Sequence, residues 1–282
     1  MSIARALSIA GSDSGGGAGV QADLKVFTVL GVYGMSVIAA VTAQNTCEVR
    51  AVHNVPSEVV SAQIDAVVAD IGVDAAKTGM LSTSELVEVV ARKLSEHRIH
   101  NIVVDPVMVS KTGAPLLEPS AVESVKRLLL PLALVVTPNL REACVLTGME
   151  IDSPEDMREA AYRILEMGPQ SVVIKGGHLT PDTYHPGLSV DLFYDGQDFI
   201  ELAGPRFPTE DTHGTGCTFS AAITAEIARG IELREAVRRA KRFIEGAIEH
   251  SLRLGKGHGP TNPWSGARKL ERAHGEGDGI VQ

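Results

Sequence analysis

The segment from Asp211 to Ile223 reads Asp-Thr-His-Gly-Thr-Gly-Cys-Thr-Phe-Ser-Ala-Ala-Ile, and its glycines stand just before an apolar helical run. Gly214 and Gly216 permit a close approach of the backbone, and the first turn of the helix supplies free N–H groups and a positive dipole end. This combination predicts an anion site that binds phosphate oxygens. The competing interpretation is a glycine-rich turn that only connects two elements.

Cys217 stands in the first turn of this predicted helix, where a catalytic carboxylate would be the more familiar residue. The helix dipole lowers the pKa of a thiol at such a place, so the sequence predicts a thiolate that can accept a proton. The alternative is a cysteine that serves as a small buried hydrophobic side chain. The neighbouring Gly214 and Gly216 favour the chemical interpretation.

Two acidic residues follow neighbouring predicted strands. Asp105 ends the apolar run Ile102–Asp105, and Glu142 comes shortly after the run Leu134–Thr137. Carboxylates at two strand ends suit a hydrated Mg²⁺, which keeps several waters and uses few protein ligands. Alternatively, Asp105 stabilises a turn and Glu142 favours a helix N-terminus. The two residues together indicate a metal more strongly than either does alone.

Other polar residues lie at or after strand ends. Lys175 ends a further apolar run and can reach a phosphate, although a solvated lysine is an equal alternative. The turn Gly11–Gly19 matches neither nucleotide-binding glycine motif, so it predicts only a polar loop that can cover a ligand. Asp23 follows in the first turns of a helix, where capping is the alternative role. Thr42–Thr46 offers donors and acceptors suited to a nitrogen heterocycle.

Short apolar runs alternate with longer helical patterns, and this alternation must position the residues above. It implies an α/β fold with right-handed crossovers and a mainly parallel sheet, in which ligands bind at the carboxyl ends of the strands. Ser189–Tyr194 and Phe199–Leu202 flank a turn and predict a hairpin at the sheet's edge. The predicted parallel strands are Ala6–Ala10, Ser36–Thr42, Ala75–Lys77, Ile102–Asp105, Leu134–Thr137 and Ser171–Lys175.

Two helix starts can be placed from capping residues. Ser153 suits a cap, Pro154 suits the first helical position, and apolar residues recur at spacings of three and four after them. Ser82 and Glu85 form the pattern of a capping box ahead of Leu86–Leu94.

Composition and charge limit the class of protein. The 282 residues are 44% hydrophobic, which allows a substantial core, and we expect one domain over residues 1–264. Residues 265–282 are charged and weakly periodic, so we expect a flexible tail. The net charge of -9 argues against nucleic-acid and anionic-membrane partners. Three cysteines without metal spacing, no leader segment and no long apolar run predict a soluble, cytoplasmic protein.

Six motifs form a combination that is far more specific than any one of them: Ala10–Lys25, Val41–Thr46, Lys77–Met80, Val104–Met108, Thr137–Asn139 and His213–Cys217. Together they resemble the hydroxymethylpyrimidine/phosphomethylpyrimidine kinases of thiamine biosynthesis. The resemblance runs from about Arg5 to Trp264. Gly255–Pro260 also resembles this family, whereas Asn262 and Pro263 stand where the family pattern leads us to expect a histidine.

The resemblance implies a ribokinase-like three-layer αβα sandwich with a mainly parallel central sheet, usually assembled as a homodimer. It also implies a reaction in two steps. ATP would phosphorylate the hydroxymethyl group of 4-amino-5-hydroxymethyl-2-methylpyrimidine, and the monophosphate would then be phosphorylated to the diphosphate. ATP, Mg²⁺ and a small pyrimidine are therefore the expected ligands.

The matching motifs also imply roles for individual residues. The pyrimidine pocket is expected to contain Gly11, Asp23, Gln44, Met80, Val107 and Cys217. The ATP site, with Mg²⁺ at Asp105 and Glu142, is expected to contain Asp105, Asn139, Glu142, Lys175, Thr209, Gly214, Gly216 and Lys241. The catalytic group is expected to comprise Cys217, Gly214, Gly216 and Lys175. Cys217 occupies the place of the aspartate base found in many ribokinase-like kinases.

The two phosphorylations make different demands on a base. The first nucleophile is an alcohol that must lose its proton, whereas the second is a phosphate that is already largely dianionic at neutral pH. If Cys217 is the base, Cys217→Ser should slow the first step much more than the second. Two other functions stay open at this stage. One is a pyridoxal kinase, because a pyridine with a hydroxymethyl group suits a similar pocket, and the other is a non-catalytic nucleotide or vitamin-precursor sensor.

Overall fold

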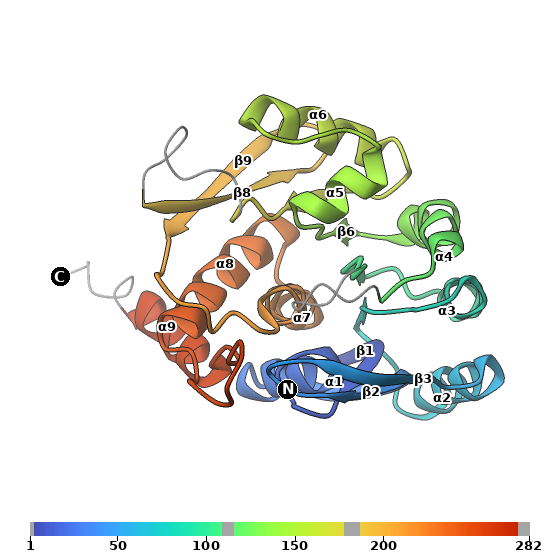
Figure 1. Ribbon diagram of the computed structural model, residues 1–282. Coiled ribbons are helices and arrows are strands. Elements are labelled where there is room, and N and C mark those ends of the chain that lie inside the picture. Colours follow the sequence, from blue (N-terminus) through green and yellow to red (C-terminus); the bar gives the residue numbers. More distant parts are fainter. Residues whose placement is uncertain (1–2, 109–115, 178–186, 276–282) are drawn as a thin grey trace.

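The computed structural model describes residues 3–108, 116–177 and 187–275 (Figure 1). Within these ranges, nine strands form one sheet in the order β3-β2-β1-β4-β5-β6-β7-β8-β9. Neighbours from β2 to β7 are parallel, and the outer strands β3, β8 and β9 are antiparallel to their neighbours. The strands are β1 (Arg5–Asp13), β2 (Tyr33–Gln44), β3 (Val49–Asn54), β4 (Ala75–Thr78), β5 (Ile102–Val104), β6 (Val135–Val136), β7 (Val172–Ile174), β8 (Leu188–Tyr194) and β9 (Phe199–Pro205).

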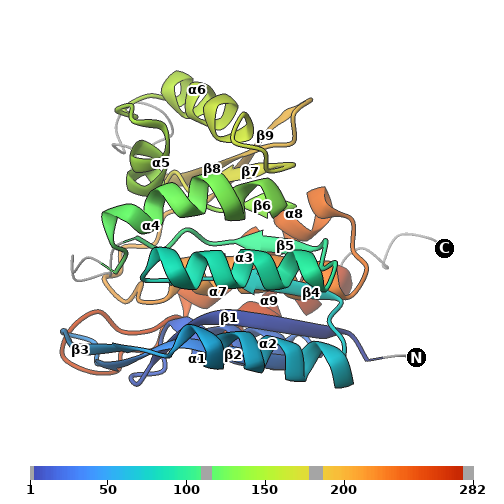
Figure 2. The ribbon, with the colours of Figure 1, turned by 90° about the vertical axis from the view of Figure 1, so that its right-hand side faces the viewer.

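Helices cover both faces of the sheet (Figure 1, Figure 2). One layer comprises α2 to α6, and the other comprises α1 and α7 to α9. The predicted three-layer αβα sandwich is therefore confirmed. The helices are α1 (Gly19–Val29), α2 (Ser57–Asp70), α3 (Ser84–Glu96), α4 (Pro119–Ser124), α5 (Leu140–Thr147), α6 (Pro154–Leu165), α7 (Thr215–Ala228), α8 (Leu233–Glu249) and α9 (Pro263–Gly275), with a π turn (Val125–Leu129) and a 3₁₀ turn (Leu130–Leu132) after α4.

The short central strands β5 and β6 form because their valines have an apolar layer to enter on each face of the sheet. Val103 packs into the core on the α7 side, and Val104 packs into the core on the α3 side. Val135 and Val136 divide between the two cores in the same way. Successive side chains of a strand point to opposite faces, so a strand covered on both sides reads as a continuous apolar run.

Both edges of the sheet carry a hairpin. The predicted one is confirmed, since Tyr194 of β8 pairs with Phe199 of β9 and Gly196 adopts a φ of 88° in the turn. At the other edge β2 extends to Gln44 and pairs with β3. The sequence did not reveal β3, because most of its side chains are exposed and no apolar run marks it.

Of the two helix caps predicted from the sequence, one is confirmed and the other is wrong. Ser153 caps α6 as expected, and Asp156 completes a capping box there. The predicted box at Ser82 and Glu85 is wrong, because Thr83 is the capping residue of α3. Ser82 instead donates a 2.6 Å hydrogen bond to Asn54 Oδ1, so a tertiary contact takes its hydroxyl.

The chain after residue 265 differs from the expected flexible tail. Residues 263–275 form α9, and Ala267 and Leu270 are buried against the layer of α7 and α8. Two glycines allow this close packing, because a Cβ on Gly246 would stand 2.8 Å from Lys269 Cβ and one on Gly266 would stand 2.7 Å from a backbone oxygen of α8. The narrow apolar stripe is hidden in the sequence by the charges around it. Residues 276–282 lie outside the described ranges.

Leu270→Ala tests whether α9 belongs to the folded unit. We expect the free energy of unfolding in urea to fall by on the order of 2–5 kcal/mol, because a buried leucine is truncated. Arg268→Ala, at an exposed position of the same helix, should change it by less than about 0.5 kcal/mol. Equal, small effects of both substitutions would show that α9 adds nothing to stability.

Candidate active site

The predicted anion turn forms at the N-terminus of α7 and lies against two other loops. Gly214 is the N-cap residue with a φ of 76°, and a Cβ there would overlap the carbonyl oxygen of Gly17. A Cβ on Gly216 would stand 3.3 Å from Lys175 Nζ and 3.8 Å from Asp105 Oδ2. The two glycines therefore bring the positive end of α7 against the polar ends of β5 and β7.

Asp105 is the buried centre of these polar strand ends. Its Oδ1 accepts a 3.1 Å hydrogen bond from Lys175 Nζ, and its Oδ2 accepts a 3.2 Å bond from Ser220 Oγ of α7. Burial alone would raise the pKa of Asp105, but the charges of Lys175 and Lys77 hold it below its ordinary value. Asp105 therefore remains an anion inside the fold.

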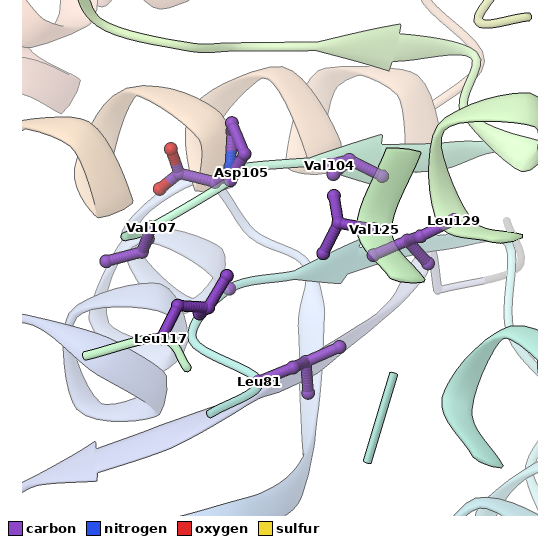
Figure 3. Close-up of a pocket in the computed structure, with 9 residues that line it drawn as sticks. Leu81, Val104, Asp105, Val107, Leu117, Val125 and Leu129 are labelled. Carbon is purple, nitrogen blue, oxygen red and sulfur yellow. The ribbon is translucent and has the colours of Figure 1, made fainter. Parts of the chain in front are cut away.

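The aliphatic side chains behind Asp105 hold it at the edge of the sheet. Figure 3 shows the carboxylate turned away from Val104, Val125 and Leu129, which line a cavity of about 10 Å³. A cavity this small holds no ligand. The carboxylate of Asp105 therefore points away from these aliphatic side chains and toward the anion turn.

Glu142 is held by a capping box at the start of α5. Asn139 Oδ1 accepts a hydrogen bond from Glu142 N, and Glu142 Oε2 accepts a 2.8 Å bond from Asn139 N. Burial raises the pKa of Glu142 to about 7, Lys175 opposes the rise, and Asp105 adds to it. The predicted role of Glu142 at a helix start is thus confirmed, and its role as a Mg²⁺ ligand stays a prediction.

Cys217 lies in the first turn of α7, as predicted, but its pKa shifts the other way. Burial raises the pKa of the thiol to about 11, and the charge of Lys77 only partly offsets this. The carboxylates of Asp105 and Asp23 raise it further, while the N–H of Gly19 lowers it. The predicted lowering of this pKa is therefore wrong, because desolvation and two nearby carboxylates raise it by more than Lys77 and the N–H of Gly19 lower it.

Lys77 is a charged residue of this region to which the sequence analysis gave no role. It is fully buried in β4, and its Nζ donates to Asp23 Oδ1 at 2.7 Å and Oδ2 at 2.8 Å. Ser8 Oγ donates a 2.6 Å bond to the same carboxylate. Burial lowers the pKa of Lys77, but Asp23, Cys217 and Asp105 together raise it above its ordinary value. A lysine inside a buried strand was itself a signal, since it requires an acidic partner.

Four of the residues expected around a pyrimidine lie near or just after the carboxyl ends of β1, β2, β4 and β5. Gly11 and Met80 lie against each other, since a Cβ on Gly11 would stand 2.6 Å from Met80 Cε. Gln44 ends β2. Its backbone carbonyl accepts a hydrogen bond from the Ser14 hydroxyl, and its backbone N–H donates one to the same hydroxyl. Val107 follows β5 and is half-buried. Asp23 is placed differently, because it is fully buried and its oxygens are occupied by Lys77 and Ser8.

Two residues expected near ATP have other contacts. Lys241 Nζ is buried and donates to Asp191 Oδ2 at 2.9 Å, while Asp191 Oδ1 accepts from Gly176 N. Lys241 therefore supports the backbone immediately after Lys175. The hydroxyl of Thr209 accepts a 3.1 Å bond from the backbone N–H two residues later and organises the segment before α7.

Neither a metal cluster nor a membrane span is evident in the described ranges. No group of three or more His, Cys, Asp or Glu side chains there is arranged to hold a metal ion. Of the helices in the same part of the chain, none combines the length and apolar character that a membrane crossing requires.

A three-layer αβα sandwich with acidic strand ends facing a glycine turn at a helix N-terminus defines a ribokinase-like kinase. The family model for phosphomethylpyrimidine kinase matches residues 13–262, and the chain belongs to that family. It is 50% identical over 262 residues to the hydroxymethylpyrimidine/phosphomethylpyrimidine kinase of Bacillus subtilis, covering 93% of this chain and 95% of the relative.

Solved structures show the same likeness. The phosphomethylpyrimidine kinase of Clostridium difficile superposes with a TM-score of 0.77 at 43% identity, covering 88% of this chain and 100% of the other. The pyridoxal kinase of Staphylococcus aureus in complex with AMP-PCP superposes with a TM-score of 0.86 at 40% identity, covering 94% and 95% of the two chains. The resemblance to the pyrimidine kinase family is therefore confirmed.

Gly214→Ala tests the close approach of the anion turn. Displacing that turn by about 1 Å should lower kcat by on the order of 100-fold, because the added Cβ overlaps a backbone oxygen. Gly148→Ala is the matched control, since Gly148 has a φ of 71° and open space around it. It should cost about 1–2 kcal/mol of stability and leave kcat unchanged. An active Gly214→Ala variant would show that the close approach is dispensable.

Proposed function

We propose that this chain phosphorylates 4-amino-5-hydroxymethyl-2-methylpyrimidine on its hydroxymethyl group and then phosphorylates the monophosphate to the diphosphate. ATP is the phosphoryl donor in both steps, and the product serves thiamine biosynthesis. The observation that carries this proposal is the position of Gly216, which places the anion turn within contact of Lys175 and Asp105. The names of the relatives support the choice of substrate.

The nucleotide belongs between the anion turn and the ends of β6 and β7. The positive charge of Lys175 would face the transferred phosphoryl group. The backbone N–H of Lys175 donates a 2.8 Å hydrogen bond to Pro138 O, which helps to fix the residue. Asn139 lies beside it, because the two residues form a bridge next to the sheet. Gly214 and Gly216 supply the exposed start of α7. Phosphoryl transfer depends mainly on positioning and charge neutralisation, and this set of residues provides both.

Mg²⁺ fits the acidic pair Asp105 and Glu142. Their oxygens are the ligands that Mg²⁺ prefers, and two carboxylates leave the remaining positions to water and phosphate. Burial raises the pKa of Glu142 to about 7, and the nearby carboxylate of Asp105 adds to the rise. When bound, the ion would neutralise charge on the phosphates. Glu142 and Asp105 would hold it, and Lys175 would balance the remaining negative charge.

The protein's own residues then perform the transfer by orientation. Gly11, Gln44, Met80 and Val107 would orient the pyrimidine so that its hydroxymethyl oxygen faces the γ-phosphorus. Cys217 stays a neutral thiol at neutral pH, because its pKa of about 11 leaves little thiolate.

The carboxylate of Asp23 is bonded to Lys77, so Asp23 would act on the substrate indirectly, through Lys77. Thr209 and Lys241 would act by supporting the loops around ATP.

The setting of the enzyme is also part of this proposal. All three cysteines are free thiols, which fits the reducing cytoplasm. A homodimer, which the family resemblance implies, is also part of this proposal.

Product identification tests the proposed function. The protein is incubated with ATP, Mg²⁺ and hydroxymethylpyrimidine, and mass spectrometry should show the monophosphate first and the diphosphate later. Pyridoxal is the second candidate substrate, because solved pyridoxal kinases are 40% identical to this chain. In a parallel incubation we expect a lower kcat/KM with pyridoxal. A higher value with pyridoxal would reverse the assignment, and no ATP consumption with either compound would favour a sensor.

Cys217→Ser tests the role of the thiol. Because the raised pKa keeps the thiol protonated at neutral pH, we expect the substitution to slow both phosphorylations by a similar factor, through a change in pocket shape. The two rate constants are measured separately in single-turnover experiments with each substrate. A much larger loss in the first step than in the second would restore Cys217 as the base, as the sequence suggested.

A further inference from the structure

Three segments that are far apart in the sequence meet at His213. His213 Nε2 lies 2.8 Å from Asp13 Oδ2, across a sequence separation of 200 residues. The backbone N–H of His213 donates to Gly259 O at 3.0 Å, and Thr261 N donates to His213 O at 3.3 Å. His213 is part of the anion turn, so the turn is joined here to segments near the beginning and the end of the chain.

Asp13 organises the glycine loop on the pyrimidine side. Its carboxylate accepts backbone hydrogen bonds from Gly15 at 2.8 Å, Gly17 at 3.1 Å and Ala18 at 2.9 Å. Asp13 is 3% exposed and His213 is 8% exposed. Burial raises the pKa of Asp13, but His213 and these N–H groups hold it below its ordinary value. The carboxylate of Asp13 is therefore a buried anion that is hydrogen-bonded by residues of both loops.

The two loops pack so closely that neither Gly17 nor Gly214 has room for a side chain. A Cβ on Gly17 would overlap the His213 ring, and a Cβ on Gly214 would overlap Gly17 O. Glycines at both positions let the backbones touch, and the Asp13–His213 pair bridges them through side chains. The contact thus fixes the loop that follows Gly11 relative to the turn that holds Cys217.

We propose that Asp13 and His213 are a positioning pair that sets the distance between the glycine loop (residues 13–18) and the anion turn (residues 212–217). The inference rests on the proposed function, because the glycine loop continues the strand that carries Gly11 of the pyrimidine pocket, and the anion turn would hold the transferred phosphoryl group. Neither side chain needs to touch a substrate for this role. The pair aligns the reacting atoms and therefore acts mainly on kcat, while nucleotide binding, to which the anion turn contributes only one of several contact regions, weakens by a smaller factor.

A His213 series tests the positioning role by the split between kcat and binding. His213→Leu keeps bulk but removes the hydrogen bond, so kcat for the pyrimidine should fall by about 10- to 100-fold. The Kd for AMP-PCP, measured by calorimetry, should rise by a clearly smaller factor than kcat falls. His213→Gln retains a donor at a similar distance and should recover most of the lost kcat. His97→Leu is the matched control, because His97 Nε2 lies 2.6 Å from Asp65 Oδ1 between α3 and α2, and it should leave kcat unchanged.

Amide hydrogen exchange provides a readout that is independent of activity. Exchange over residues 13–18 and 213–217 should increase in His213→Leu and return toward the parent rate in His213→Gln. Unchanged exchange, or equal kcat in the parent and His213→Leu, would overturn the inference. A parent protein that phosphorylates no pyrimidine would refute the proposed function alone. In that case the exchange result still decides whether the pair joins the loops.

Discussion

Buried charge at the carboxyl ends of the parallel strands has to be neutralised within the fold, and this constraint organises the whole site. Lys175 balances Asp105, and Lys77 balances Asp23, each at hydrogen-bond distance. An uncompensated charge at any of these positions would cost several kcal/mol. The helices that cover the sheet can bury its polar edge only because the charges cancel in pairs. The start of α7 then adds an electropositive surface beside them.

The same constraint explains why a thiol replaces a carboxylate at Cys217. Asp23, Asp105 and Glu142 already place three acidic groups in this region, and the pKa of Glu142 is raised to about 7. A further carboxylate would be repelled by Asp105 and Asp23, which already raise the pKa of the thiol. A cysteine fills the position without adding charge at neutral pH. This neutrality leaves the local negative charge to the phosphates of the ligand.

Long-range contacts hold the site together, and they also explain the errors of the sequence analysis. The α9 helix was expected to be a tail because Ala267 and Leu270 are isolated among charges, yet glycines on the facing helices let this short stripe pack. Ser82 fits a capping box by local rules, but its hydroxyl bonds Asn54 and Thr83 takes the cap. In each case a partner distant in sequence overrides a local preference.

Local chemistry in the sequence determined the alternation of strands and helices, the edge hairpin of β8 and β9, the anion turn at Gly214 and Gly216, and the family. These features depend on residue periodicity and on backbone freedom at glycine, which neighbouring residues specify. Only the tertiary structure decided which charges pair, namely Lys77 with Asp23 across 54 residues and His213 with Asp13 across 200 residues. It also decided the raised pKa of Cys217, because desolvation and the field of distant charges arise only when the chain is folded.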